Sequence, residues 1–252
     1  MRPLLILLAA LSVAACGKKH HDGLTVAAAS DLTDAFEAMG TAFTKKTGKK
    51  VIFTFGSSGN LAKQIQHGGP YDVFASANRA FVDQIVNSGD AVAASRATYA
   101  RGRVIVWAPG GPIGSLADLK DARFKKISLA HPDHAPYGVA GKAALQRAGV
   151  WRDVESRMVY GSNVRDALLH SETGNSDASI TALSLVIRSD KEYFVIPEEL
   201  HPPLEQSIAV IERSKHHEDA TAFVAFVQSP EGQTILRTYG LLPAGDSSPA
   251  PR

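Results

Sequence analysis

Cysteine is almost missing from this chain, since Cys16 is the only thiol among its 252 residues. A single thiol cannot form a disulfide within the chain, and it cannot build a zinc site of the paired-cysteine type. The composition, with 44% apolar and 21% charged residues, is that of an ordinary soluble globular protein. The length is sufficient for one large domain or for two lobes.

An excess of positive charge is missing as well. Lys and Arg number 27 and Asp and Glu number 25, which gives a formal net charge of +2. Proteins that bind nucleic acid usually present a strongly basic surface to the phosphates. The near balance of charges therefore argues against a nucleic-acid partner.

Long hydrophobic runs are missing too, with one exception at the start of the chain. Leu4–Val13 follows Arg2 and is too short to span a bilayer comfortably, but it fits the core of a signal peptide. The run ends in Val13-Ala14-Ala15-Cys16, which resembles a bacterial lipobox. We predict a signal peptide over 1–15, a lipidated tether over 16–23, and an exported protein, periplasmic or at the cell surface, anchored to a membrane through Cys16. The alternative is an ordinary secretory signal with a chance cysteine.

From residue 24 onward the pattern alternates between strands and helices. Leu24–Ala29 has the length of a buried strand, and the apolar residues Leu32, Phe36, Met39 and Phe43 follow at helical spacing. Further strands are predicted at 51–55, 73–75, 103–108, 127–130, 158–160, 178–181, 193–196 and 206–211, and further helices at 60–67, 136–148, 164–170, 183–188, 217–227 and 231–239. This order predicts an α/β fold of mainly parallel sheets flanked by helices.

The pattern restarts after a Pro- and Gly-rich turn at 109–112, which indicates two lobes. We predict that lobe I comprises 24–107 plus 208–242 and that lobe II comprises 108–207, with a disordered tail over 243–252. The chain would cross between the lobes near Ala108 and near Ser207. A cleft between two lobes is a common place for a ligand site.

Four places show a strand, a small polar or glycine-containing turn, and a helix start. Each helix start exposes unpaired backbone N–H groups and the positive end of the helix dipole, which together favour an anion. Such a cage offers only donors, so it favours a fully ionised dianion without Lys or Arg. Ser30 and Ser58 would add hydroxyl donors, although a serine before a helix, taken alone, is more typical of an N-cap. The four places are Ala29-Ser30-Asp31, Ser57-Ser58-Gly59-Asn60, Ala135-Pro136-Tyr137-Gly138 and Ser162-Asn163-Val164.

Five segments occur in a fixed order along the chain: AAASDL at 27–32, FGSSGNL at 55–61, GPYDVFASA at 69–77, APYG at 135–138 and SPEGQ at 229–233. Together they resemble the molybdate-binding proteins of ABC importers, and the likeness extends from about 24 to 242. The resemblance implies a two-lobed type II periplasmic-binding-protein fold with a closing cleft. It also implies molybdate or tungstate as ligand and a permease with its ATPase as partners. We expect a monomer without a cofactor.

By position, the resemblance implies that the anion is held by the hydroxyls of Ser30 and Ser58 and by the amides of Tyr137 and Val164. Some members of the family add a Tyr hydroxyl from the segment that contains Ala182 here. Alanine cannot make that contact, so the Tyr137 hydroxyl or a water could replace it. Thr181 could also take part.

Several alternatives remain open at this point. The ligand could be sulfate, thiosulfate or another oxyanion, and the protein could be a sensor lipoprotein. Ser58 could be the nucleophile of a lipid-anchored hydrolase, although its surroundings lack the Gly-x-Ser-x-Gly elbow. His131, Asp133 and His134 have a spacing that could ligate a metal, but we interpret them as a surface loop and predict no site for a free metal cation.

Overall fold

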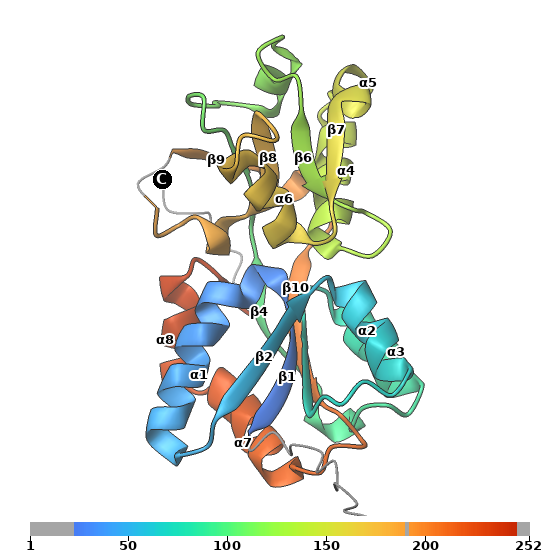
Figure 1. Ribbon diagram of the computed structural model, residues 1–252, viewed down its shortest axis with the longest axis vertical. Coiled ribbons are helices and arrows are strands. Elements are labelled where there is room, and N and C mark those ends of the chain that lie inside the picture. The colour runs from blue at the N-terminus through green and yellow to red at the C-terminus, as the bar shows by residue number, and fades with distance from the viewer. Residues whose placement is uncertain (1–22, 190–191, 246–252) are drawn as a thin grey trace, which may run out of the picture.

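The computed structural model describes residues 23–189 and 192–245, which form two lobes, each built on one β-sheet (Figure 1). The predicted signal peptide, Cys16, nearly all of the predicted tether and most of the predicted tail lie outside the described residues. Within the described ranges, no helix is both long and apolar enough to cross a membrane.

The first sheet has six strands, in the order β11-β4-β10-β3-β1-β2. These are β1 (Leu24–Ala29), β2 (Val51–Gly56), β3 (Val73–Ser76), β4 (Ala97–Gly102), β10 (Leu204–Val210) and β11 (Leu242–Pro243). β1 runs parallel to β2 and β3, and the remaining pairs are antiparallel.

The second sheet has five strands, in the order β7-β6-β8-β5-β9. These are β5 (Val104–Trp107), β6 (Ile127–Ala130), β7 (Met158–Gly161), β8 (Ala178–Ala182) and β9 (Tyr193–Val195). β6 runs parallel to β7 and β8, whereas β5 is antiparallel to β8 and β9. The two-lobed α/β prediction is confirmed, but both sheets are mixed rather than mainly parallel, because strands that cross from the other lobe join them in the opposite direction.

The predicted lobe boundaries differ from the sheets by a few residues. β4 and β5 are separated only by Arg103, so the chain crosses there and not near Ala108. β10 begins at Leu204, which pairs with Gly102, so 204–207 belong to the first sheet. Pro243 pairs with β4 as part of β11, so the predicted tail begins too early. An apolar strand shows its burial in the sequence, but not which of two sheets it joins.

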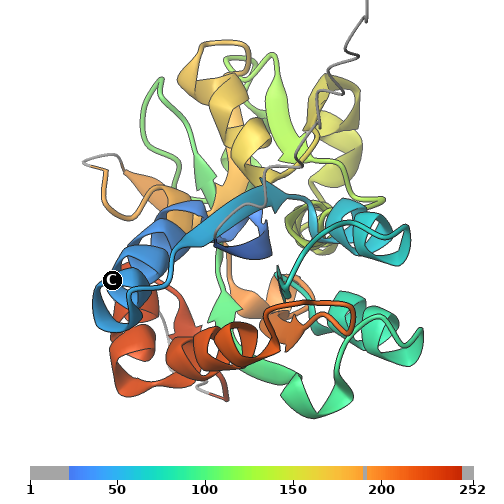
Figure 2. The ribbon, with the colours of Figure 1, turned by 60° about the horizontal axis from the view of Figure 1, so that its bottom comes forward.

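Helices cover both faces of the first sheet (Figures 1 and 2). One face carries α1 (Thr33–Thr47), α7 (His217–Gln228) and α8 (Pro230–Thr238), and the other carries α2 (Ser58–Gln66) and α3 (Arg79–Asn87). The second lobe contains α4 (Pro136–Arg147), α5 (Trp151–Val154) and α6 (Val164–Glu172). Short 3-10 helices are η1 (Ser30–Leu32), η2 (Ala93–Ser95), η3 (Leu116–Lys120), η4 (Glu155–Arg157), η5 (Leu183–Leu185) and η6 (Glu198–Leu200).

β1 shows why the first sheet is buried on both faces. Val26 and Ala28 point into the core that also contains the residues of α1, while Ala27 between them packs in the core under α2 and α3. Successive side chains of a strand point to opposite faces, so a strand covered on both faces reads as a continuous apolar run. The predicted stripe of α1 is fully buried, and Gly48, with φ of 75°, ends that helix in the left-handed conformation.

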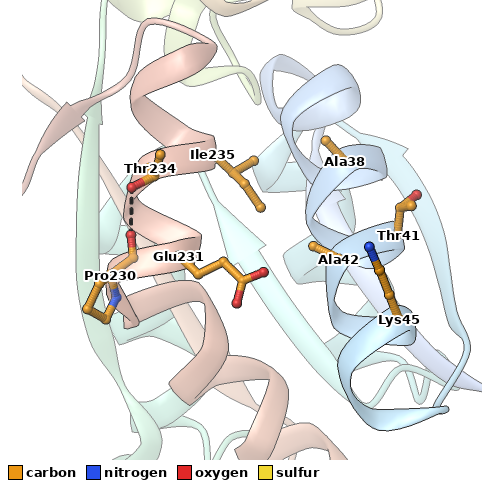
Figure 3. A pocket seen from close by; sticks show the side chains of 8 residues that line it. All are labelled: Ala38, Thr41, Ala42, Lys45, Pro230, Glu231, Thr234 and Ile235. Atoms are coloured by element: carbon orange, nitrogen blue, oxygen red, sulfur yellow. Dashed lines mark hydrogen bonds between the residues drawn. The ribbon is translucent and has the colours of Figure 1, made fainter.

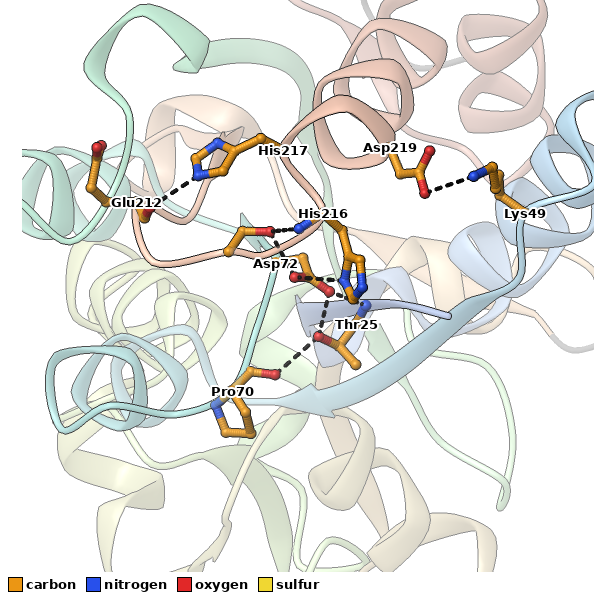
Figure 4. Close-up of polar contacts among 9 residues, drawn as sticks. Thr25, Lys49, Pro70, Asp72, Glu212, His216, His217 and Asp219 are labelled. Atoms are coloured by element: carbon orange, nitrogen blue, oxygen red, sulfur yellow. Dashed lines mark hydrogen bonds and ion pairs between the residues drawn. The ribbon is translucent and has the colours of Figure 1, made fainter. Parts of the chain in front are cut away.

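A polar network closes the end of the first sheet that lies far from the second lobe (Figure 4). Asp72 precedes β3, and its Oδ2 accepts hydrogen bonds from the Thr25 amide at 2.7 Å and the Thr25 hydroxyl at 2.8 Å. Its Oδ1 accepts from the Ser214 hydroxyl at 2.7 Å, and His216 Nδ1 lies 3.3 Å away. The network joins the start of β1 to the segment between β10 and α7.

Candidate functional site

A small cavity lies where helix starts of the two lobes meet. The empty space there, including its opening to solvent, is about 180 Å³. All four predicted contact residues, Ser30, Ser58, Tyr137 and Val164, line this cavity, although their role in binding stays a prediction. The complete lining is Ala29, Ser30, Asp31, Gly56, Ser57, Ser58, Ala77, Ala135, Pro136, Tyr137 and Val164.

Strand ends explain this convergence. In open α/β sheets, ligand sites form beyond the carboxyl ends of parallel strands, because the following helices start there. η1 follows β1 directly, and α2 starts two residues after β2. In the second lobe, α4 and α6 follow β6 and β7. The first turn of each helix leaves amide groups without an acceptor inside the helix.

The two serines do not cap their helices. The residues at the N-cap positions are Ala29 and Ser57, and neither side chain makes a capping hydrogen bond. The Ser58 hydroxyl oxygen instead accepts from the Ala77 amide at 3.1 Å, which leaves its hydrogen available to a ligand. The Ser30 hydroxyl has no hydrogen-bond partner in the described part of the chain. The N-cap interpretation of these serines is therefore wrong.

The second lobe contributes its amides through tightly packed helix starts. Pro136 occupies the first turn of α4, where its missing N–H is not needed, and Tyr137 follows. A side chain on Gly138 would overlap the Ala130 carbonyl, so the start of α4 lies directly on the end of β6. At α6 the Asn163 side chain caps the Asp166 amide at 3.0 Å, and Thr181 donates its hydroxyl to the Val164 carbonyl at 3.3 Å. Thr181 thus supports the start of α6.

Two contacts at the mouth of the cavity join the lobes. The Gly59 amide donates to the His134 carbonyl at 2.9 Å. His134 Nδ1 lies 3.0 Å from the Ser57 hydroxyl. A Cβ at Gly59 would lie 2.8 Å from the same carbonyl oxygen, so only glycine permits this approach. The structure therefore represents a closed arrangement of the lobes.

The Tyr137 hydroxyl reaches across the cleft to a partner that sequence reasoning did not assign. It donates to Asp31 Oδ2 at 3.1 Å, so this hydroxyl is already engaged and does not replace the tyrosine contact missing at Ala182. Ala182 itself is buried in β8 and pairs with Val104. Asp31 was visible in the sequence at the end of a strand, but nothing there showed that it would meet the other lobe.

Charge is scarce in the cavity wall. Among the described residues that line it, none is Lys or Arg, and Asp31 and Tyr137 are the ionisable groups. Burial raises the pKa of Asp31 to about 7, against the hydrogen bonds from Gln206 and Tyr137 that lower it. Burial, together with the charge of Asp31, raises the pKa of Tyr137 well above its usual value. Uncharged amides and hydroxyls are therefore the groups that face a ligand.

Two further candidates from the sequence were a metal site in the loop at 131–134 and a nucleophile at Ser58. His131 and His134 stack with ring centroids 5.3 Å apart, but among the described residues no group of three or more His, Cys, Asp or Glu could hold a metal ion. The histidine at the cleft contacts Ser57 rather than Ser58, so Ser58 lacks the base that a hydrolase nucleophile needs.

A larger hollow, with about 1220 Å³ of empty space including its opening to solvent, lies between α1 and α8 (Figure 3). Its charged groups, Lys45 and Glu231, belong to exposed helix faces, and its wall is otherwise mostly apolar. It does not gather donors from several helix starts.

Comparison with known proteins agrees with this geometry. The family model of the bacterial extracellular solute-binding proteins matches residues 24–242. The chain is 33% identical over 221 residues to the molybdate-binding protein ModA of Azotobacter vinelandii, covering 85% of this chain and 88% of that protein. It is 31% identical over 246 residues to ModA of Escherichia coli, covering 92% and 94% of the two chains.

A solved structure shows the same fold. The periplasmic molybdate-binding protein of Azotobacter vinelandii superimposes with a TM-score of 0.81 at 27% identity. The match covers 87% of this chain and 98% of that chain. The similarity therefore includes both lobes.

Proposed function

We propose that this chain, which belongs to the family of bacterial extracellular solute-binding proteins, captures molybdate and delivers it to an ABC importer. The observation that carries the proposal is the convergence of Ser30, Ser58, Tyr137 and Val164 on one cavity without Lys or Arg. Relatives at 31% and 33% identity are named molybdate-binding proteins, which supports the choice of anion.

The mechanism follows from the donor set. With the lobes apart, the dianion meets the hydroxyls of Ser30 and Ser58 at the first lobe. Closure then brings the amides of Tyr137 and Val164 onto the opposite side of the anion. Because the amide donors are fixed by helix geometry, they need little reorganisation when the ligand arrives. The closed form would then dock on the permease, whose ATPase drives uptake.

The energies are sufficient. A hydrogen bond to a charged group contributes about 1.5–3 kcal/mol, and a helix N-terminus adds about 0.3–1 kcal/mol or more where it is buried. Six or seven such bonds, less the costs of desolvation and closure, can reach micromolar affinity, about −8 kcal/mol. A protonated ligand would leave its O–H without an acceptor, so the cage prefers a fully ionised dianion.

Titration calorimetry of the mature protein with molybdate, tungstate, sulfate and phosphate tests the proposal. We expect strong binding of molybdate and of tungstate, which has nearly the same size, and weak or no binding of the other two. Strong heat with sulfate and none with molybdate would reject the substrate.

Serine variants test the site itself. Ser30→Ala and Ser58→Ala should each weaken molybdate binding about tenfold to a hundredfold, because each removes one hydrogen bond to a charged ligand. The matched control is Ser156→Ala on the exposed surface of the second lobe, which should bind like the wild type. Equal affinities for Ser58→Ala and Ser156→Ala would remove Ser58 from the site.

We further propose that Cys16 is lipidated and anchors a monomer to the membrane surface. Fractionation of cells that express the full chain tests the anchor: the wild type should sediment with membranes, and Cys16→Ser should be released. Light scattering of the mature protein tests the monomer. A Cys16→Ser chain that stays in the membrane fraction would contradict the lipid anchor.

A further inference from the structure

Asp31 places a carboxyl group in the wall of a cavity proposed to hold a dianion. It follows Ser30 directly, lines the cavity and is only 1% exposed. An ionised carboxylate here would repel the ligand, since a buried site screens charge poorly. The surroundings of Asp31 show how this conflict is avoided.

Asp31 is a point at which hydrogen bonds tie the first lobe to the second. Its Oδ2 accepts from the Tyr137 hydroxyl of the second lobe at 3.1 Å and from Gln206 Nε2 of β10 at 2.6 Å. Its backbone carbonyl accepts from the Ser184 hydroxyl, also of the second lobe, at 2.6 Å. Gly102 makes room, because a Cβ there would overlap the Tyr137 hydroxyl. The bonds from Tyr137 and Ser184 cross between the lobes, whereas the bond from Gln206 stays within the first lobe.

Two buried acceptors in this tie receive no hydrogen bond in the described part of the chain. Asp31 Oδ1 and Gln206 Oε1 are buried acceptors that receive no hydrogen bond from any described residue, and the buried Tyr99 hydroxyl also has no partner there. Buried acceptors without donors are unfavourable. A proton on Oδ1 would remove the negative charge and turn an unpaired acceptor into a donor. Oδ2 already accepts two hydrogen bonds, so Oδ1 is the place for the proton.

Among the described residues packed around Asp31, none supplies a cation that would keep it ionised. The titratable groups that face it are Tyr137 of α4 and Tyr99 of β4, and both are neutral acids raised in pKa by burial. Arg103, between β4 and β5, donates Nε to the Gly240 carbonyl and acts on Tyr137 rather than on Asp31. The remaining neighbours are uncharged: Ser184 in η5, Val164 at the start of α6 and Gly56 at the end of β2. The raised pKa of Asp31, about 7, agrees with this environment.

We propose that Asp31 is a proton-carrying positioning residue, held as the neutral acid when the lobes close on the anion. A proton from the buffer forms the O–H bond on Oδ1, so capture of one dianion takes up as much as one proton. Asp31 acts on the ligand through Ser30 beside it and through Tyr137, whose hydroxyl it holds. The inference rests on the proposed function for the dianion, but not on which oxyanion is bound.

The sign of the pH dependence follows. Burial in the closed arrangement raises the pKa of Asp31 from 3.8 to about 7, and opening of the lobes would expose the carboxyl and lower that pKa. Affinity should therefore be complete below the open-state pKa and decline as pH rises through about 7. Molybdate affinity should fall about tenfold between pH 6 and pH 8, since a group with a pKa of about 7 goes from nearly fully protonated to nearly fully ionised in that interval.

Calorimetry with molybdate at pH 7, in two buffers of different ionisation enthalpy, counts the protons taken up. We expect a clearly positive count, up to one, for the wild type and a count near zero for Asp31→Asn, which keeps the size and the accepting oxygen. The double variant His131→Asn with His134→Asn is the control for the histidines at the cleft, and it should keep the wild-type proton count.

The outcomes separate the two proposals. Molybdate binding without proton uptake in the wild type, or equal uptake in Asp31→Asn, overturns the role of Asp31 and leaves the proposed function standing. Uptake with sulfate or phosphate, together with no binding of molybdate, overturns the molybdate assignment and supports Asp31. Absence of binding to any oxyanion overturns both. If Asp31→Asn does not fold, the counts of the wild type and of the histidine variant still decide, because loss of uptake in the latter assigns the proton to histidine.

Discussion

Two aspartates at opposite ends of the first sheet, Asp72 and Asp31, differ in how many hydrogen bonds their carboxyl groups receive. Asp72, at the amino ends of β1 and β3, has hydrogen-bond donors on both carboxyl oxygens, all from the first lobe. Asp31, beyond the carboxyl end of β1, has donors on one oxygen only, and one of them comes from the other lobe. Burial alone would raise the pKa of both.

The pKa values follow this difference. At Asp72 burial is outweighed by the bonds from the Thr25 amide, Ser214, the Thr25 hydroxyl and His216, so the pKa is lowered. At Asp31 burial prevails. Asp72 accepts hydrogen bonds from its own lobe on both oxygens, whereas Asp31 depends on the second lobe for one of the two bonds to its Oδ2. The hydrogen bonds of Asp72 therefore do not depend on the position of the second lobe, whereas the bond between Asp31 and Tyr137 does.

The largest effect is expected for Asp31→Asn, which should remove most of the change in the free energy of unfolding with pH that the wild type shows. The pKa rises from 3.8 to about 7 on folding, so the wild type loses stability as pH rises through that range. At 1.36 kcal/mol per unit the loss is at most about 4 kcal/mol over the whole range and about 2.7 kcal/mol between pH 5 and pH 8, and opening of the lobes relieves part of it. Urea unfolding at pH 5 and pH 8 should show a decline for the wild type relative to Asp31→Asn. Parallel pH profiles would contradict the raised pKa.

Gly102→Ala should break the Tyr137–Asp31 bond without replacing a residue that is proposed to contact the anion. The added Cβ overlaps the Tyr137 hydroxyl, so Tyr137 must move and lose Asp31. We expect molybdate affinity to fall about a hundredfold, about 2.7 kcal/mol. Gly110→Ala is the matched control, because its Cβ would meet nothing within 4 Å. Calorimetry in which both variants bind alike would show that closure does not need the Tyr137–Asp31 bond.

This comparison also shows how far sequence reasoning reached. Local sequence chemistry predicts the apolar stripe of α1 and the small turns before α2 and α4. The positions of the four helix starts could therefore be predicted, and the structure shows that they line one cavity. α3 and β4 were not predicted, and β5 was assigned to the wrong lobe, because an apolar strand carries no sign of its partner.

The interlobe tie could not be predicted at all. Asp31, Tyr137, Ser184 and Gln206 are far apart in the chain, and each has an ordinary local setting. Only the closed arrangement of the lobes brings their side chains together. A polar residue after a strand was a visible signal, but the partner across the cleft was not.

Asp72→Asn tests the far end. The amide cannot accept on both sides, so hydrogen bonds from Thr25 or Ser214 are lost inside one lobe. We expect the free energy of unfolding at pH 7 to fall by about 2 kcal/mol, since bonds to a charged group contribute about 1.5–3 kcal/mol each and some are retained. Calorimetry should show unchanged molybdate affinity. A loss of affinity equal to that of Gly102→Ala would mean that the two ends are coupled.

His216→Ala should have the smallest effect and separates the members of the Asp72 network. The His216 side chain is 43% exposed and its Nδ1 lies 3.3 Å from Asp72 Oδ1, so water can replace it when it is removed. Contacts of this kind contribute at most about 0.5–1 kcal/mol. Urea unfolding at pH 7 should therefore place His216→Ala within about 0.5 kcal/mol of the wild type, well above Asp72→Asn. A loss as large as that of Asp72→Asn would show that the histidine, rather than Thr25 and Ser214, holds the carboxylate in place.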